Sequence, residues 1–238
     1  MNMHGKTNQR ATLVSFSGID GAGKSTQIEA LCQRLQEIGL RVQLIRFWDD
    51  IARLKSIRES AGHALFKGDK GVGTPDAPIT RKDKNVRSWG MTWIRMVLYF
   101  LDVLATRNAV HKALLTDADF IIFDRYCYDE LANLNLRTRV LRIYTRMILK
   151  IIPVLNRSYL LDADPLAAHA RKPEYPLDFV HLNRMAYLKM SCLSNRMTVI
   201  APMGREEVGQ AILRYTLEDL RHSTIPGKNG GYSSKRMA

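Results

Sequence analysis

The sequence predicts an α/β domain in which helices cover both faces of a five-stranded parallel sheet. Three observations support this: short apolar segments alternate with longer segments of helical periodicity, turn residues separate them, and 238 residues suffice for one sizeable core. The strands are expected at residues 11–16, 41–47, 119–123, 159–161 and 197–200. We expect the domain to span residues 11–221, between a flexible N-terminus at 1–10 and a disordered basic tail at 222–238.

Composition indicates a globular protein that attracts anions. The chain is 46% hydrophobic and 25% charged, which is ordinary, but its formal net charge is +13. That charge suits nucleotides, nucleic acids and acidic membrane surfaces alike, so it does not choose among them. Three widely spaced cysteines predict neither a disulfide framework nor a cysteine-based metal site. Without a run of ~18 apolar residues or a secretory signal, we expect a cytoplasmic protein with no transmembrane segment.

The most informative stretch runs from Gly18 to Thr26 and fits the pattern G-x-x-x-x-G-K-[ST]. It lies between the first predicted strand and a helix expected over residues 27–38. There the glycines let backbone N–H groups converge on a polyphosphate, and the helix points the positive end of its dipole at the same place. The pattern predicts a phosphate site made of Gly18, Asp20, Gly21, Ala22, Gly23, Lys24, Ser25 and Thr26.

Two side chains of this phosphate loop, or P-loop, have distinct expected roles. Lys24 would bridge the β- and γ-phosphate oxygens of ATP, and the Ser25 hydroxyl would ligate Mg²⁺. The alternative is a glycine-rich turn that matches the pattern by chance. Because kinases, regulatory GTPases and ATPases all use such a loop, the motif predicts a bound nucleotide but no particular reaction.

A carboxylate and a guanidinium follow the third predicted strand. Asp124 and Arg125 come directly after residues 119–123, and the carboxyl ends of parallel strands form the ligand-binding edge of such a sheet. We expect Asp124 to hold Mg²⁺ together with Ser25, and Arg125 to contact the transferring phosphoryl group. The structural alternative is that this polar strand end caps the next helix.

Two central segments leave alternatives open. Residues 51–88 form a turn-rich insertion beside the expected site, which fits a lid, a substrate wall or a disordered insertion. A long helix expected over residues 89–115 carries Arg95, Asp102 and Arg107. Their intervals suit either substrate binding or a solvated face with ion pairs.

The C-terminal half continues the alternation. One basic amphipathic helix is expected over residues 128–152; it could lie on a membrane, but we expect it to pack on the sheet with its basic side in water. A short helix over residues 166–171 follows the fourth strand, and Arg171 and Lys172 at its end either close over phosphates or lie exposed. Further helices are expected over residues 177–195 and 205–220.

The order of these segments resembles the nucleoside monophosphate kinases among P-loop NTPases, and most closely the thymidylate kinase family. Four stretches carry the resemblance: residues 17–27, residues 123–126 (Phe-Asp-Arg-Tyr), residues 160–165 followed by Arg171, and the last strand with residues 206–208. Together they extend over about residues 11–220.

The resemblance implies that ATP, with Mg²⁺, donates its γ-phosphoryl group to a small-molecule acceptor, a nucleoside monophosphate such as thymidine monophosphate. The implied catalytic residues are Lys24, Asp124, Arg125 and Arg171, the last in a short LID-like loop at residues 171–177. The implied substrate-binding residues are Asp20, Arg46, Arg95, Arg107 and Tyr126. A homodimer is possible, and no specific nucleic acid is expected.

The acceptor side departs from the family pattern. Arg46 matches, but the Glu-Pro that should follow is absent; Asp102 and Arg107 lack the spacing of the family's Asp-Arg pair; and Asp129 replaces a serine. A deoxynucleoside kinase or another small-molecule kinase of the same fold, with a carboxylate base at residue 49 or 50, is therefore an alternative. A nucleic-acid- or membrane-associated P-loop ATPase is another, although no aromatic-interleaved basic motif suggests base stacking.

Overall fold

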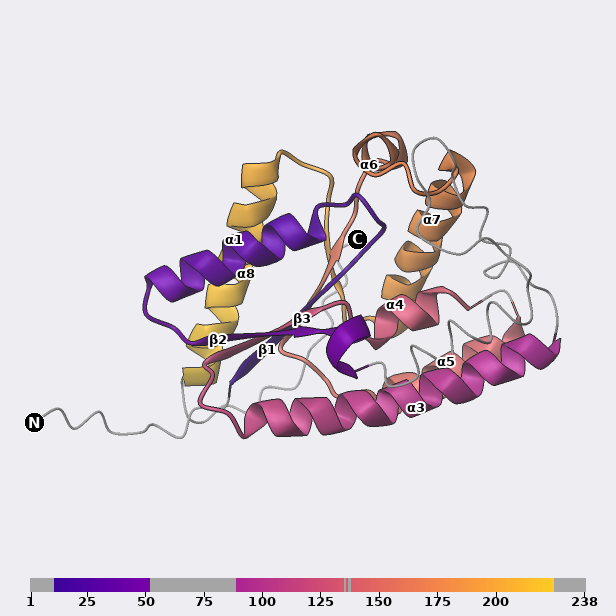
Figure 1. Cartoon of the computed structure of the whole chain (residues 1–238), viewed down its shortest axis with the longest axis horizontal. Helices are drawn as coiled ribbons and strands as arrows, with labels where there is room; N and C mark the ends of the chain where they lie inside the picture. The colour runs from indigo at the N-terminus through magenta and orange to yellow at the C-terminus, as the bar shows by residue number, and fades with distance from the viewer. Residues whose placement is uncertain (1–10, 52–88, 135, 137, 225–238) are drawn as a thin grey trace, which may run out of the picture.

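The computed structural model describes residues 11–51, 89–134, 136 and 138–224, and it contains the predicted parallel sheet. Five parallel strands form this sheet in the order β2-β3-β1-β4-β5 (Figure 1). The strands are β1 (Thr12–Ser17), β2 (Val42–Arg46), β3 (Phe120–Asp124), β4 (Arg157–Leu161) and β5 (Thr198–Ile200). The α/β class and the five predicted strands are confirmed.

The central strand β1 is buried over its whole length, which explains its continuous apolar and small-residue sequence. It pairs with β3 on one side, with Phe16 opposite Asp124, and with β4 on the other, with Ser17 opposite Leu160. The loop after β1 therefore emerges between the carboxyl ends of β3 and β4. This is the position at which open parallel sheets bind ligands.

Helices cover both faces of the sheet because alternate strand residues point to opposite sides. One face packs against α1 (Lys24–Glu37) and α8 (Arg205–Thr224). The other packs against α3 (Trp89–Leu114), α4 (Cys127–Ala132), α5 (Arg139–Ile151) and α7 (Leu177–Ser194). In β1, Val14 and Phe16 pack on the side of α1 and α8, whereas Leu13 packs on the side of α3, α4, α5 and α7. A short helix, η1 (Phe47–Ile51), follows β2, and α6 (Pro165–Arg171) follows β4.

The single helix predicted over residues 128–152 is wrong, because the chain forms two helices, α4 and α5. The Asn133 side chain donates to the Asp129 carbonyl at 3.0 Å, and the Leu134 N–H bonds to the Leu131 carbonyl, which closes α4 with a tight turn. Leu134 is 6% exposed and packs in the core. Burial of that leucine outweighs continuous helical periodicity in this segment.

Helix α8 continues through Thr224, four residues beyond its predicted end and three residues into the predicted tail. The predicted flexible N-terminus at 1–10, residues 52–88 of the predicted insertion and residues 225–238 of the predicted tail lie outside the described residues. Among the described helices, none is long and apolar enough to cross a membrane.

Candidate functional site

The loop after β1 owes its shape to glycines. Gly18, Gly21 and Gly23 have φ values of 142°, 81° and 86°, a region that side-chain-bearing residues rarely adopt. At Gly21 a Cβ atom would overlap the carbonyl of Ala168 in α6. Only glycine therefore lets the loop lie directly against α6. Arg171 is the last residue of α6, and Lys172 follows it.

The loop leads into the N-terminus of α1 without any side-chain cap. Gly23 is the N-cap residue, no side chain bonds to the cap position, and the first turn of α1 contains no acidic residue. The first N–H groups of a helix have no partner within the helix, and the helix dipole makes this end attractive to anions. The start of α1 is thus suited to hold a phosphate group.

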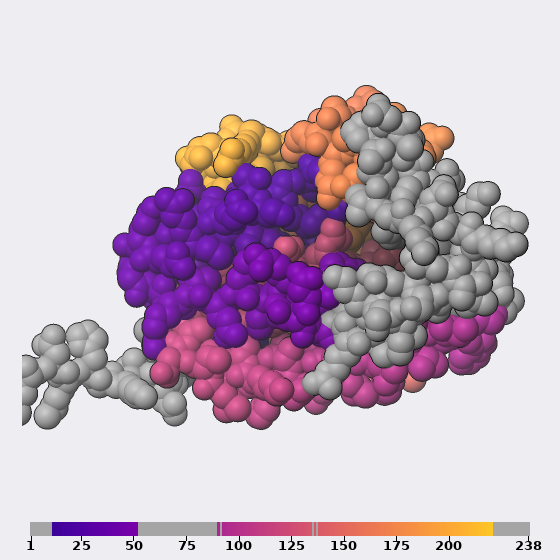
Figure 2. All heavy atoms as spheres, in the orientation of Figure 1, coloured from indigo at the N-terminus to yellow at the C-terminus, as the bar shows by residue number. Residues whose placement is uncertain are grey.

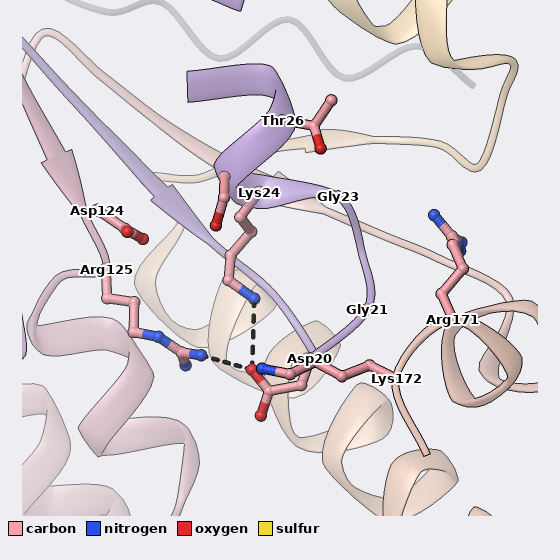
Figure 3. Close-up of a pocket in the computed structure, with 10 residues that line it drawn as sticks. Asp20, Gly21, Gly23, Lys24, Thr26, Asp124, Arg125, Arg171 and Lys172 are labelled. Atoms are coloured by element: carbon pink, nitrogen blue, oxygen red, sulfur yellow. Dashed lines mark hydrogen bonds and ion pairs between the residues drawn. The ribbon is translucent and has the colours of Figure 1, made fainter. Parts of the chain in front are cut away.

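A pocket of about 340 Å³ opens beside this loop and is polar in its lining (Figure 3). Figure 2 shows a hollow between the indigo N-terminal segment and the orange segment that contains α6 and α7. The pocket is lined by Asp20, Gly21, Gly23, Lys24, Ser25, Thr26, Asp124, Arg125, Arg171 and Lys172. Four of these side chains are cationic and two are carboxylates, so the pocket favours a polyanion. The structure therefore brings together all four predicted catalytic residues.

Lys24 lies over the loop with its amine satisfied by backbone. Its Nζ donates to the carbonyls of Gly18 and Ile19, each at 2.8 Å, and lies 3.9 Å from Asp20 Oδ1. The side chain is 7% exposed. Burial, and after it the charge of Arg125, lower the pKa of Lys24 to about 8. A phosphate group would offer this ammonium a stronger acceptor than two neutral carbonyls.

Asp20 and Arg125 form a close ion pair between the loop and the end of β3 (Figure 3). Arg125 Nη2 donates to Asp20 Oδ1 at 2.5 Å. Burial alone would raise the pKa of Asp20, but the charges of Arg125 and Lys24 lower it to about 2. Asp20 is therefore ionised at neutral pH, and the pair holds the guanidinium beside the phosphate loop.

The backbone of Arg125 is strained, with φ of 69° in the left-handed region. Its N–H donates to the Phe16 carbonyl at 3.0 Å, which fixes the residue to the end of β1. Strain of this kind costs of order 1–3 kcal/mol and persists only where neighbouring contacts impose it. The two carboxylates around its guanidinium, those of Asp20 and Asp129, are such contacts.

Asp129 is a buried carboxylate beneath this pair. It is 2% exposed and accepts hydrogen bonds from Ser17 Oγ at 2.6 Å and Tyr187 OH at 2.8 Å. It also accepts from the Tyr126 backbone N–H at 3.1 Å and lies 3.7 Å from Arg125 Nη1. One carboxylate thus joins the end of β1, the start of α4 and α7 to the arginine of the pocket.

Arg171 and Lys172 approach the loop from the side opposite Asp124 and Arg125 (Figure 3). Both are exposed, and α6 is held at its start by Asp164, which accepts from the Ala167 N–H at 2.9 Å. A Cβ atom at Gly23 would lie 4.0 Å from Arg171 Nη1, so this guanidinium is at the loop. Lys172 pairs with Glu174 at 3.2 Å. Arg171 is thus an exposed cation at the mouth of the pocket, and its Nε donates to the Ala167 carbonyl of α6 at 3.0 Å.

The predicted Mg²⁺ ligands Ser25 and Asp124 both line the pocket. Among the described residues no three His, Cys, Asp or Glu side chains gather as a metal cluster. Mg²⁺ usually takes one or two protein oxygens and completes its shell with water and substrate phosphates. A hydroxyl and a carboxylate beside a phosphate cradle fit that requirement.

Not every predicted site residue lines the pocket. Gly18 and Ala22 shape the loop: a Cβ at Gly18 would lie 2.6 Å from the Leu161 carbonyl, and the Ala22 N–H bonds to Ile19. Arg46 ends β2 opposite Asp124 and is exposed, and Arg95 lies half-buried on α3. Neither is among the residues that line the pocket.

Two residues that the resemblance implies as substrate contacts have partners elsewhere in the structure. Tyr126 is fully buried, and its hydroxyl donates to the Pro153 carbonyl at 2.9 Å. Arg107 donates to the Ile151 carbonyl at the end of α5, at 2.9 Å, because the last carbonyls of a helix lack partners within it. The third residue of interest on α3, Asp102, is 1% exposed, which also excludes the solvated face considered for it.

Two residues gain importance beyond their sequence signals. Lys172 lines the pocket beside Arg171. In the sequence, only its place next to Arg171 in a basic pair pointed to the site. Asp129 reads in the sequence as a departure from a family serine, on the acceptor side. The i to i+4 spacing from Arg125 on a helix start is the signal that could have linked them.

Comparisons with known proteins found no match to this chain, either in a scan against protein-family models or in a search of curated proteins. The geometry of the pocket is therefore the basis for a functional proposal.

Proposed function

We propose that this chain is an ATP-dependent phosphotransferase of the nucleoside monophosphate kinase type. It would move the γ-phosphoryl group of ATP to the phosphate of a nucleoside monophosphate, with thymidine monophosphate as the preferred acceptor. The observation that carries the proposal is the convergence of Lys24, Arg125 and Arg171 on one pocket from three separate elements. A site for nucleotide binding alone would not need cations on both sides of the phosphate chain.

Lys24 and the start of α1 would hold the donor. On phosphate binding, the Lys24 ammonium exchanges the Gly18 and Ile19 carbonyls for phosphate oxygens. The negative charge of ATP raises the pKa of this amine above about 8, so the lysine remains protonated during binding. The N–H groups of the loop and of α1 contact the same phosphates.

Arg125 and Arg171 would stabilise the transferring group from opposite sides. Arg125 is preoriented by Asp20 and Asp129, so little side-chain entropy is lost when it contacts the phosphates between donor and acceptor. Arg171 is exposed and moves in over the γ-phosphoryl group as the LID-like loop at residues 171–177 closes. Charge placed where it develops in a metaphosphate-like transition state lowers the barrier without a strong general base.

Ser25 and Asp124 would hold Mg²⁺, which would supply charge neutralisation across the phosphate oxygens. Asp20, on the acceptor side of the loop, would face the acceptor sugar, as the family resemblance implies. The hydroxyl-phosphorylating alternative is favoured less, because its candidate bases Asp49 and Asp50 are exposed and neither lines the pocket; Asp50 accepts from the Arg46 N–H at the end of β2 at 2.7 Å.

The test is ATP consumption with a panel of nucleoside monophosphates and deoxynucleosides, with products identified by mass. We expect phosphorylation of at least one monophosphate, and its loss in Lys24→Ala. Lys24→Ala should also abolish ATP binding in calorimetry, whereas Lys189→Ala, an exposed lysine on α7, should not. ATP binding without phosphorylation of any monophosphate would reject the acceptor class, and phosphorylation of a nucleoside hydroxyl would reassign it.

A further inference from the structure

The outward face of α3 carries an apolar stripe away from the pocket. Its members are between 39% and 56% exposed and recur at helical spacing: Trp93, Val97, Phe100, Leu101 and Leu104. At about 100° per residue they fall within roughly a third of the helix circumference. Exposed apolar residues scattered singly are normal, but a contiguous stripe marks an interaction surface. The acidic residue of α3, Asp102, is buried on the opposite side.

Helix α5 combines apolar and cationic residues on its exposed side. Val140, Ile143 and Met147 are 46%, 57% and 58% exposed. The four exposed cations of the same helix are Arg139, Arg142, Arg146 and Lys150. None of its 13 residues is acidic. In projection the cations occupy one half of the exposed arc and the apolar residues the other.

The apolar parts of the two helices adjoin. Tyr144 OH donates to the Met96 carbonyl at 2.5 Å, and Arg107 donates to the Ile151 carbonyl at 2.9 Å. Tyr144 projects from the side of α5 that borders Val140 and Met147, so this side faces α3. Figure 1 shows α3 and α5 running alongside each other at the lower edge of the molecule. We call these exposed residues of both helices the α3–α5 surface.

We propose that the α3–α5 surface binds the interfacial region of membranes that contain anionic lipids. An apolar stripe with aromatic and aliphatic side chains inserts at the boundary of headgroups and acyl chains, while flanking cations contact lipid phosphates. The charge pattern selects this occupant: cations border the apolar stripe, and the acidic residue of α3 is buried on the other side. The proposed attachment is peripheral, because α3 and α5 each keep one face buried in the domain core and present only the other face.

A second copy of the chain fits this surface less well. In a two-fold dimer the same patch meets itself, so the α5 cations of both copies would enter one interface without acidic partners from α5. The net charge of +13 on each chain adds to that repulsion. Anionic headgroups instead neutralise these side chains. None of the residues that line the pocket belongs to α3 or α5, so a membrane on the α3–α5 surface would not contact the pocket lining. The inference therefore does not depend on the proposed reaction.

The test is co-sedimentation of the full chain with vesicles of phosphatidylcholine, with and without phosphatidylglycerol. We expect binding only to the anionic vesicles. Each cation near such a surface contributes about fivefold in partitioning, so Arg142→Gln with Arg146→Gln should weaken binding about 30-fold. The charge-preserving pair Arg142→Lys with Arg146→Lys should restore it. The matched control, Lys189→Gln with Arg214→Gln on α7 and α8, removes the same charge elsewhere and should change binding little.

A second pair of variants tests insertion. Val97→Ser with Leu104→Ser should weaken binding about tenfold or more, because less apolar area leaves water. Leu182→Ser with Met185→Ser on α7 is the control, since those residues are 63% and 51% exposed but lie outside the α3–α5 surface. Circular dichroism of each variant checks its fold. The proposal is overturned if the chain does not bind anionic vesicles, or if the control variants on α7 and α8 lose as much vesicle binding as the variants on α3 and α5. A solution dimer that Val97→Ser with Leu104→Ser dissociates also overturns it, since that would identify a second copy as the occupant.

Discussion

Replacing Asp129 by Asn tests whether a buried carboxylate holds the pocket arginine in place. The substitution keeps the shape of the side chain but removes its charge and turns one acceptor oxygen into a donor amide. Ser17 Oγ, Tyr187 OH and the Tyr126 N–H all donate to this carboxylate, and Arg125 lies 3.7 Å from it. At least one of these hydrogen bonds would then be lost or reversed in direction, and Arg125 would lose one of its two carboxylate neighbours.

The magnitude follows from burial and partner number. A hydrogen bond to a charged group contributes about 1.5–3 kcal/mol, and removing one partner of a buried ion pair costs about 3–5 kcal/mol. These terms overlap, so we expect the free energy of unfolding to fall by about 3–5 kcal/mol rather than by their sum. Urea unfolding followed by tryptophan fluorescence should show a lower midpoint at unchanged slope.

The control is Asp119→Asn at the exposed pair with Arg41, whose side chains are 35% and 62% exposed. That surface pair contributes about 0–1 kcal/mol. Phosphotransfer should also fall in Asp129→Asn, because Arg125 loses its orientation. If Asp129→Asn cost less than about 1 kcal/mol, as the Asp119 control should, the reasoning that makes Asp129 the centre of this network would be refuted.

Three further predictions concern the loop and its cations. Gly21→Ala should lower the free energy of unfolding by about 1–3 kcal/mol more than Gly39→Ala and should abolish ATP binding. Both residues have φ near 80°, but a Cβ at Gly39 meets nothing within 4 Å, whereas a Cβ at Gly21 overlaps α6. Equal losses of stability in the two variants would exclude the contact with α6. Burial lowers the pKa of Lys24 from 10.5 to about 8, so between these pH values the unfolded chain binds more protons than the folded one. Stability of the wild type relative to Lys24→Met should therefore rise by about 3 kcal/mol from pH 8 to pH 10.5, and a flat difference in urea midpoints would contradict the buried, desolvated amine. Arg171→Ala should reduce kcat about 10³-fold with little change in ATP affinity or stability, since the residue is exposed; a loss confined to KM would assign it to binding alone.

Much of the site could be predicted because its residues lie at positions that local sequence identifies. The P-loop is one continuous stretch between a strand and a helix, and Asp124 and Arg125 follow a strand directly, so parallel pairing alone brings them to one edge. Arg171 could be placed because Asp164 and Pro165 mark the start of α6. Parallel strand pairing and helix-start signals sufficed to place these residues, whereas the catalytic role expected for Arg171 came from the family resemblance.

Local sequence was least informative where long-range packing decides the outcome. Tyr126 follows Arg125 directly, yet its side chain turns into the core to the Pro153 carbonyl, which lies 27 residues further along the chain. Arg107 has the charge expected of a residue that binds phosphate, but its guanidinium donates a hydrogen bond to the Ile151 carbonyl at the end of α5. The break between α4 and α5 depends on the burial of Leu134, which periodicity alone cannot reveal.

The sequence by itself determined the class of fold, the five strands and the glycine loop after β1, because these depend on local periodicity and on the glycines between Gly18 and Gly23. Tertiary structure alone decided which cations meet in the pocket and what holds them. Asp20 meets Arg125 across 105 residues of the sequence, a separation that no local pattern encodes. Neighbouring cations then keep Asp20 ionised, and burial lowers the pKa of Lys24. The α3–α5 surface likewise exists only because two helices pack side by side with some of their apolar residues turned outward, in addition to those buried in the core. Periodicity specifies which residues share a face of a helix, but only packing decides which face is covered.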